Sequence, residues 1–320
     1  AHKILQSYFR SRRYAGSKDR NAIRKKVFDI IRNRARLDWW IADKLGDNDS
    51  SVRLRIIASI QTLDKTGPNA FNNFFLGEPY SPDNLNFEEK KLIKSLAGKN
   101  ILHEAMPLGI RYEVPDWLEK HFQSQWGKNF EKEMSALNTE APVDLRVNIS
   151  HVSREQARKS LSIDKIKTKP TTLSPWGLRM IKHGLLEKTK AFKKGLVEVQ
   201  DEGSQLIAML CNAKSGMTVV DYCAGAGGKT LALASSMALQ SNEKNMSSLI
   251  ACDISKRKLS VMSNRLKRAG VRDVRKIILP DLDSITKLEG KADRVLVDAP
   301  CSGIGIWRRH PEARWKLTSE

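Results

Sequence analysis

The sequence has few cysteines, no long apolar run and no initiating methionine. Its four cysteines, among 320 residues, show neither C-x-x-C spacing nor a histidine-rich neighbourhood. We therefore expect reduced thiols and no metal site. No apolar run approaches the roughly 18 residues of a membrane span, so we expect no membrane partner. The chain begins with Ala1 and lacks an apolar signal region, which predicts a piece of a cytoplasmic protein.

Acidic residues are also in the minority. Lys and Arg outnumber Asp and Glu by 56 to 36, which gives a formal net charge of +20. That much positive charge favours a polyanionic partner, with nucleic acid ahead of a membrane surface. The basic residues are spread along the chain, so charge alone does not locate the partner.

Three regions differ in their pattern. Residues 1–135 place apolar residues at helical spacing, with Arg and Lys between them, and predict helices. Residues 140–200 predict a small α/β subdomain. There Val143, Leu145, Val147 and Ile149 alternate with polar residues, which is typical of a half-buried strand. Residues 201–320 alternate strand and helix patterns, which predicts a parallel sheet with ligands at the carboxyl ends of its strands.

Basic residues of the first region, including Lys25 and Arg32, lie between its apolar positions. They fit two interpretations equally well. They form either a solvated helix face or a surface that contacts the phosphates of RNA.

The stretch VVDYCAGAGGKT, residues 219–230, reads as a strand, a tight turn and a helix. Glycine allows the backbone to approach a ligand closely, and the helix start offers free N–H groups. This order is that of the first unit of a Rossmann-type nucleotide fold.

Several nucleotide-binding motifs compete for this turn. A P-loop needs a glycine at the position of Cys223, and a dinucleotide fingerprint needs one at Thr230, so both fail. Asp221 followed by Gly225 and Gly227 fits the loop of enzymes that use S-adenosylmethionine. An ordinary strand-to-helix turn of another α/β domain is the alternative.

Each expected strand of the third region is followed by an aspartate. These residues are Asp221, Asp253, Asp281 and Asp298. The spacing of Asp253 from the glycine turn suits an acid that binds ribose hydroxyls, and Asp281 is placed to contact the adenine amino group. The alternative for each residue by itself is a carboxylate that caps a helix.

The fourth strand runs into Pro300-Cys301-Ser302. A thiolate that adds to carbon 6 of a pyrimidine makes carbon 5 nucleophilic enough to accept a methyl group, and the thiol later leaves. A small packed cysteine is the alternative. Arg308, Arg309 and Arg314 follow, and we expect them beside the pocket, where an RNA backbone would lie.

Three segments together resemble the RsmB/Sun family of RNA cytosine-5 methyltransferases. They are DYCAGAGGKT, ACDISKRKLSVMSNRLKRAG and DRVLVDAPCSGIGIWRRHPEARW, and the resemblance covers at least residues 198–320. It implies a Rossmann-like domain that binds S-adenosylmethionine. The helical region resembles the NusB-like RNA-binding domain of the bacterial RsmB branch, and the implied substrate is small-subunit (16S) ribosomal RNA.

The resemblance also implies roles for individual residues. The cofactor loop comprises Cys223, Ala224, Gly225, Ala226, Gly227, Gly228 and Lys229. Ala226 stands where the family often has proline. Asp253 matches the ribose-binding acid, Asp281 the adenine-side acid and Asp298 the acid beside the methyl group and the target base. Cys301 matches the cysteine that assists product release.

In this family the attacking cysteine lies in a Thr-Cys motif after strand five. No such motif follows Cys301 in the sequence. We therefore expect a methyltransferase domain truncated after strand four, with the nucleophile beyond Glu320 and an exposed apolar sheet edge.

Two other functions stay open. One is a non-catalytic RNA-binding factor with a degenerate cofactor domain. The other is an enzyme that methylates base nitrogens, although such enzymes commonly carry Asn/Asp-Pro-Pro-Tyr where this chain has Asp298-Ala299-Pro300-Cys301. For the leading hypothesis we expect a monomer that binds S-adenosylmethionine and RNA.

Overall fold

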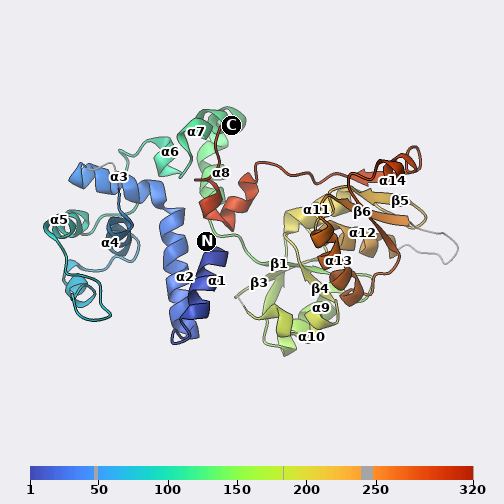
Figure 1. Cartoon of the computed structure of the whole chain (residues 1–320), viewed down its shortest axis with the longest axis horizontal. Helices are drawn as coiled ribbons and strands as arrows, with labels where there is room; N and C mark the ends of the chain where they lie inside the picture. Colours follow the sequence, from blue (N-terminus) through green and yellow to red (C-terminus); the bar gives the residue numbers. More distant parts are fainter. Residues whose placement is uncertain (47–49, 183, 239–247, 320) are drawn as a thin grey trace. The chain divides into compact units, whose positions relative to one another are not determined.

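The chain divides into two compact units in the computed structural model, which describes residues 1–319 except 47–49, 183 and 239–247 (Figure 1). The helical unit comprises Ala1–Ala141 and Ser302–Glu320. The two-sheet unit comprises Pro142–Cys301. No helix of the described residues is long and apolar enough to cross a membrane.

In the described part of Ala1–Ala141 the regular elements are helical, in line with the helices predicted for residues 1–135. The helices are α1 His2–Ser11, α2 Ser17–Arg32, α3 Arg34–Leu45, α4 Val52–Thr62, α5 Phe87–Leu96, α6 Leu108–Arg111, α7 Asp116–Trp126 and α8 Phe130–Leu137, with short 3-10 turns at Pro68–Asn73 and Gly127–Asn129. Ser51 caps α4 by accepting a hydrogen bond from Leu54 N. Leu37, Trp40 and Ile57 lie at the centre of the first apolar cluster.

The last segment of the chain packs with these helices rather than with the sheet that precedes it. It holds two 3-10 turns, Ile304–Arg308 and Pro311–Ala313. Trp307 is 1% exposed and joins Phe122, Phe130 and Met134 in a second apolar cluster. Burial of this tryptophan anchors residues 302–320 in the helical unit, so the unit boundary falls inside the domain predicted for 201–320, whose bounds stay a prediction.

The two-sheet unit opens with a four-stranded antiparallel sheet. Its strands are β1 Asp144–Val147, β2 Thr168–Pro170, β3 Gly177–Met180 and β4 Val197–Val199, in the order β2-β3-β1-β4. Helices α9 Arg154–Ile163 and α10 Lys190–Lys193 accompany it, with a 3-10 turn at Leu186–Lys188. Ser153 and Gln156 form a capping box at the start of α9.

Strand β1 is buried on both faces, and the prediction of a half-buried strand was wrong. Leu145 and Val147 enter the apolar cluster of the small sheet. The opposite face carries Asp144 and Arg146, each 2% exposed. Their polar groups are paired with residues from β3 onward, so a polar face became a buried one.

The second sheet is parallel, as the strand and helix alternation predicted. Its strands are β5 Thr218–Asp221, β6 Ser248–Asp253, β7 Val274–Ile278 and β8 Arg294–Leu296, in the order β7-β6-β5-β8. The helices are α11 Glu202–Leu210, α12 Gly228–Ala238, α13 Lys256–Arg268 and α14 Leu282–Thr286. The switch in strand order falls between β5 and β8, where open α/β sheets bind their ligands.

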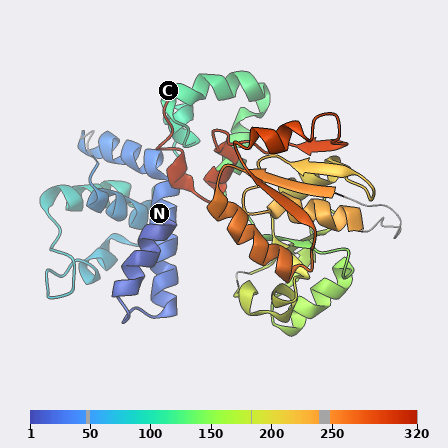
Figure 2. The same ribbon diagram turned by 45° about the vertical axis from the view of Figure 1, so that its right-hand side comes forward.

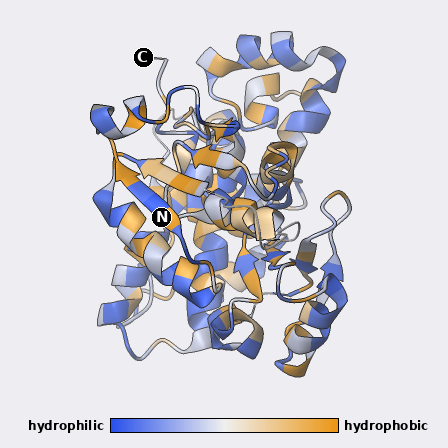
Figure 3. Cartoon of the chain, turned by 90° about the vertical axis from the view of Figure 1, so that its right-hand side faces the viewer, coloured by the Kyte–Doolittle hydropathy of each residue, from blue (hydrophilic) through white to orange (hydrophobic). Residues whose placement is uncertain are grey.

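Both faces of the parallel sheet are covered. Val219 packs with Leu233 and Met237 of α12, whereas its neighbour Val220 packs on the other face with Ile250 and Ile277. Helix α13 lies along β6 and β7 (Figure 2). Apolar colour follows the strands and the inward helix faces in Figure 3. At the edge, Val295 and Val297 are more than half exposed, in line with the expected apolar edge.

Candidate functional site

The glycine loop joins the carboxyl end of β5 to the first turn of α12. Gly225 and Gly227 have φ angles of +56° and +84°. A Cβ on Gly227 would come within 2.4 Å of Met262 Cγ, so this position has neither the conformation nor the space for a side chain. The predicted strand, tight turn and helix are therefore confirmed.

Hydrogen bonds with neighbouring elements fix the backbone of the glycine loop. Ala224 N donates to the carbonyl of Cys252 at 2.8 Å, and Gly225 N donates to Asp253 Oδ2 at 2.9 Å. On the other side, Arg265 Nη1 donates to the carbonyl of Ala226 at 2.8 Å. The arginine thus supports the position where the family often has proline.

A pocket of about 270 Å³ lies at the carboxyl ends of β5 and β8, against the start of α12 and the segment before α11. It is lined by Val199, Gln200, Asp201, Ser204, Asp221, Cys223, Ala224, Gly228, Lys229 and Asp298. Of the predicted loop residues, four line it directly. Gly225, Ala226 and Gly227 shape the turn behind it.

Asp221 is the most deeply buried acid of the pocket, at 1% exposure. Its Oδ2 accepts a hydrogen bond from Thr230 Oγ1 at 2.7 Å. Its Oδ1 has no hydrogen-bond partner among the described residues. Burial raises the pKa of this carboxyl, against the opposing effect of the Thr230 hydroxyl. A buried acceptor without a partner is what a ligand with an N–H group would satisfy.

Lys229 and Asp298 form an ion pair across the pocket, with 2.5 Å between Nζ and Oδ2. The lysine side chain is 12% exposed and the aspartate side chain 50% exposed. The pair joins the start of α12 to the segment after β8, so two of the predicted site residues meet at the pocket wall.

The other two strand-end aspartates are engaged elsewhere. Asp253 is 6% exposed, and its Oδ1 accepts from Ser255 N at 2.7 Å in addition to its bond with Gly225. Asp281 caps α14 through Ser284 N at 3.0 Å, and these hydrogen bonds lower its pKa. Only two of the four aspartates line the pocket, so the capping alternative describes Asp281 in this structure.

Four wall residues were not among the predicted site residues. Val199, Gln200, Asp201 and Ser204 come from the end of β4 and the start of α11. In the sequence, Val199 and Gln200 fall in a short strand-like stretch, and Asp201 and Ser204 fall at the start of a helix. They lie about 20 residues before the glycine loop, and no periodic pattern in the sequence links them to it. The fold of the small sheet brings them back to the pocket.

The cysteines differ in their surroundings. Cys223 is half-buried in the pocket wall, and Cys301 is exposed at the end of the two-sheet unit. Cys252 is buried beneath the loop, where desolvation raises its pKa to about 11. The described residues contain no cluster of three or more potential metal ligands.

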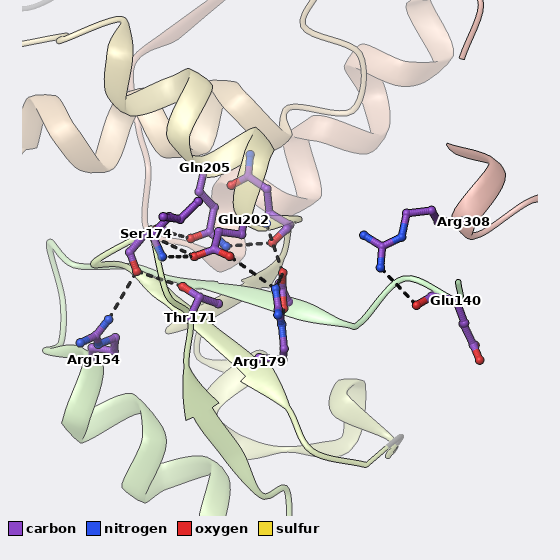
Figure 4. Close-up of polar contacts among 11 residues, drawn as sticks. Glu140, Arg154, Thr171, Ser174, Arg179, Glu202, Gln205 and Arg308 are labelled. Carbon is purple, nitrogen blue, oxygen red and sulfur yellow. Dashed lines mark hydrogen bonds and ion pairs between the residues drawn. The ribbon is translucent and has the colours of Figure 1, made fainter. Parts of the chain in front are cut away.

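The predicted RNA-contacting arginines are largely occupied within the helical unit. Arg314 is 1% exposed, its Nη1 donates to the Glu113 carbonyl at 2.8 Å, and its guanidinium lies over Trp307. A role for Arg314 in direct RNA contact is therefore wrong for this structure, because the residue is a buried structural cation. Arg308 donates to the carbonyl of Glu140, as drawn in Figure 4.

Arg32 and Lys25 differ from each other. Arg32 donates to the carbonyls of Asn138 and Arg308, and its burial lowers its pKa. It is thus half-buried and tied to the last segment of the chain. Lys25 is exposed and pairs with Asp29 at 2.7 Å. Contact of Lys25, Arg32, Arg308 and Arg309 with RNA stays a prediction.

Two family profiles match the chain. The family described as 16S rRNA methyltransferase RsmB/F matches residues 208–320. A ferredoxin-like domain of RsmF/B-like methyltransferases matches residues 114–185. The chain belongs to the RsmB/Sun family. S-adenosylmethionine is the cofactor of this family, and the glycine cradle and the unpaired Asp221 oxygen fit such a ligand.

Curated relatives agree with this assignment. The chain is 31% identical over 207 residues to the probable ribosomal RNA small subunit methyltransferase B of Coxiella burnetii, covering 64% of this chain and 47% of the relative. It is 32% identical over 228 residues to the Synechocystis protein of the same name, covering 69% and 49%. The chain thus spans about half the length of these relatives.

Solved structures share the fold. The crystal structure of PH0851 superposes with a TM-score of 0.69 at 23% identity, covering 98% of this chain and 73% of that one. The structure of NSun6 from Pyrococcus horikoshii with SFG gives a TM-score of 0.52 at 19% identity, covering 63% and 79%. At these identities the likeness establishes a shared fold alone.

Proposed function

We propose that the protein transfers a methyl group from S-adenosylmethionine to carbon 5 of a cytosine in RNA, with small-subunit (16S) ribosomal RNA as substrate. One observation carries the proposal. The pocket with the unpaired Asp221 oxygen lies at the end of the strand that leads through Asp298 to Pro300-Cys301. The names of the curated relatives support the choice of ribosomal RNA.

The chemistry asks for a thiol that the substrate base can reach. Addition of a thiolate to carbon 6 of cytosine makes carbon 5 nucleophilic, and S-adenosylmethionine would supply the methyl group and leave as S-adenosylhomocysteine. A base then removes the carbon-5 proton as the thiolate leaves carbon 6. The family resemblance gives the attack to a second cysteine and the release step to Cys301. Exposure of Cys301 supports this role, because a base and a leaving thiol need access to it.

Residues around the pocket have proposed roles of their own. Lys229 and Asp298 hold each other at the pocket wall, where they would contact the cofactor beside the target base. Asp253 supports the loop with two backbone hydrogen bonds. A carboxylate offers about four acceptor positions, so it keeps capacity for ribose hydroxyls.

The helical unit is the proposed RNA-binding part, as a NusB-like domain. Exposed cations on α2 such as Lys25 support this role, as does the net charge of +20. Contacts of this kind weaken as salt concentration rises, since they release counterions from the RNA.

The test uses the whole protein with unmodified small-subunit ribosomal RNA and methyl-labelled S-adenosylmethionine. Nucleoside digestion and mass spectrometry should find the label in 5-methylcytidine. Label on a base nitrogen or on ribose would contradict the proposal. RNA binding without any methyl transfer would favour the non-catalytic RNA-binding factor.

A pair of cysteine variants tests the release step. Cys301→Ala should accumulate a covalent complex with cytidine RNA, visible as a protein band of lower mobility, because the enzyme cannot leave carbon 6. Cys211→Ala is the matched control, since Cys211 lies outside the pocket lining. Equal behaviour of the two variants would remove Cys301 from the mechanism.

A further inference from the structure

Gln200 occupies an unusual place in the pocket wall. It is 8% exposed, and it follows β4 of the small sheet directly. Its backbone N–H donates to the Asp144 carbonyl at 3.0 Å, and its own carbonyl accepts from Gln205 Nε2 at 2.8 Å. The backbone of this residue is therefore fixed on both sides.

A buried arginine fixes the side chain as well. Arg146 Nε donates to Gln200 Oε1 at 2.7 Å. A guanidinium can only donate, so the amide oxygen must face Arg146 and the amide nitrogen must face away from it. Gln200 Nε2 then lies 3.9 Å from the place that a Cβ on Gly228 would take, at the start of α12.

The amide nitrogen of Gln200 is the next group to place. Among the described residues, none accepts a hydrogen bond from Gln200 Nε2. The pocket wall thus carries one oriented donor from Gln200, and the lining residue Asp221 has a buried Oδ1 that has no partner among the described residues. A ligand with a carboxylate and an ammonium group on the same carbon satisfies both.

Burial of the charged Arg146 guanidinium costs desolvation free energy, which its partners must offset. The residue is 2% exposed, and burial lowers its pKa to about 10. Its cross-strand neighbour Glu198 supplies opposite charge but bonds to Arg265 and Arg268 instead. The remaining hydrogen bond of Arg146, to Ser235 Oγ at 3.4 Å, is long. Its closest contact is the amide oxygen of Gln200.

We propose that Gln200 binds the carboxylate of the amino-acid end of the cofactor, and that Arg146 is the positioning residue that aims its amide nitrogen there. Asp221 Oδ1 takes the ammonium group of the same end. The inference rests on the proposed cofactor site, and it gives the small antiparallel sheet a direct part in cofactor binding.

The experiment compares two ligands by calorimetry on the full chain. S-adenosylhomocysteine carries the amino-acid end, and 5′-methylthioadenosine lacks it. Gln200→Ala should weaken S-adenosylhomocysteine about tenfold and leave 5′-methylthioadenosine within about twofold of wild type. Gln156→Ala is the matched control, because Gln156 belongs to the same unit but caps α9 and does not line the pocket. It should leave the affinity for both ligands within about twofold of wild type.

Arg146→Met tests the positioning step. It should weaken S-adenosylhomocysteine about threefold, and the double variant should bind no worse than Gln200→Ala alone, since Arg146 acts through Gln200. If Arg146→Met does not fold, Arg146→Lys replaces it. Additive losses, or equal losses for both ligands, would overturn the positioning role.

The outcomes separate this inference from the cofactor site. The inference fails, and the cofactor site stands, if wild type binds S-adenosylhomocysteine and Gln200→Ala gives either of two results. One result is unchanged affinity for both ligands, and the other is an equal loss of affinity for both. If wild type binds neither ligand, the cofactor site itself fails and the inference falls with it.

Discussion

The two sheets of the two-sheet unit bury their charged side chains in opposite ways. In the antiparallel sheet, both oxygens of Asp144 accept from Arg179, at 2.7 and 2.9 Å. Glu202 of α11 accepts from Arg179 and from the backbone N–H of Ser174 (Figure 4). In the parallel sheet, Asp221 is equally buried but keeps one oxygen unpaired.

This difference distinguishes charged groups that stabilise the fold from charged groups that are available to bind a ligand. A closed polar network stabilises one arrangement of the chain, since every buried group already has its partner. A buried polar group without a partner costs desolvation free energy, and a bound ligand that pairs with it removes this cost. The network of Asp144 and Arg179 therefore supports the fold, whereas the unpaired oxygen at the end of β5 is available to a ligand.

The largest expected effect comes from a substitution in the glycine loop beside Asp221. Gly227→Ala adds a Cβ against Met262 at a φ of +84°, so the loop must move. We expect a loss of S-adenosylhomocysteine affinity of about 100-fold or more, measured by calorimetry. Gly225→Ala is the control, because its Cβ meets nothing within 4 Å. Equal losses would show that strain, not contact with Met262, decides.

The helical unit adds a buried carboxylate of its own. Glu113 is 0% exposed and accepts from the backbone N–H groups of Ala35 and Arg36, each at 3.0 Å. Burial nevertheless raises its pKa from 4.5 to about 7. The folded state therefore binds this proton more tightly, so the stabilisation is complete below about pH 4.5 and is lost as pH rises through about 7.

The loss should reach about 3 kcal/mol between pH 4 and pH 8, seen as a falling unfolding free energy in denaturant titrations. Glu113→Gln should flatten this dependence, and Glu104→Gln, on an exposed residue, should not. The difference between the unfolding free energies of wild type and Glu113→Gln should fall as pH rises over this range. A difference that stays flat or rises would contradict the account.

Two matched substitutions test the comparison itself. Asp144→Asn breaks a closed network and should cost about 2 kcal/mol of stability while cofactor affinity changes little. Asp221→Asn should leave stability unchanged or raise it, because an ionised carboxylate is no longer buried, yet weaken S-adenosylhomocysteine about tenfold. Chemical denaturation and calorimetry of both variants would show a reversed pattern if the distinction were mistaken.

The smallest effect concerns Asp281, which caps α14. Asp281→Ala should lower the midpoint of chemical denaturation slightly, whereas Asp281→Ser keeps a capping oxygen and should not. If the proposed adenine contact exists, both variants weaken S-adenosylhomocysteine about threefold. Unchanged affinity in Asp281→Ser would leave Asp281 as a cap only.

Much of the methyltransferase part could be predicted from local sequence. The apolar run into Asp221, the glycines after it and the helix beyond follow from short-range rules, and the structure confirms them. The role of β1 could not, because Arg146 is paired with Gln200, 54 residues later. Its alternating pattern is typical of a half-exposed strand until that partner is known.

The segment after Cys301 shows the same limit. Arg308, Arg309 and Arg314 follow the reactive motif so closely that sequence places them at the pocket. Burial of Trp307 among the side chains of α7 and α8 makes this segment part of the helical unit, which local sequence patterns do not indicate.

The most direct test is a crystal structure of the protein with S-adenosylhomocysteine at saturating concentration. The account predicts the ligand in the pocket between the glycine loop and Asp298, with its ammonium group within hydrogen-bond distance of Asp221 Oδ1. A ligand bound elsewhere, or a ligand in the pocket with Asp221 Oδ1 still unpaired, would contradict the claim that this open acceptor marks the cofactor site.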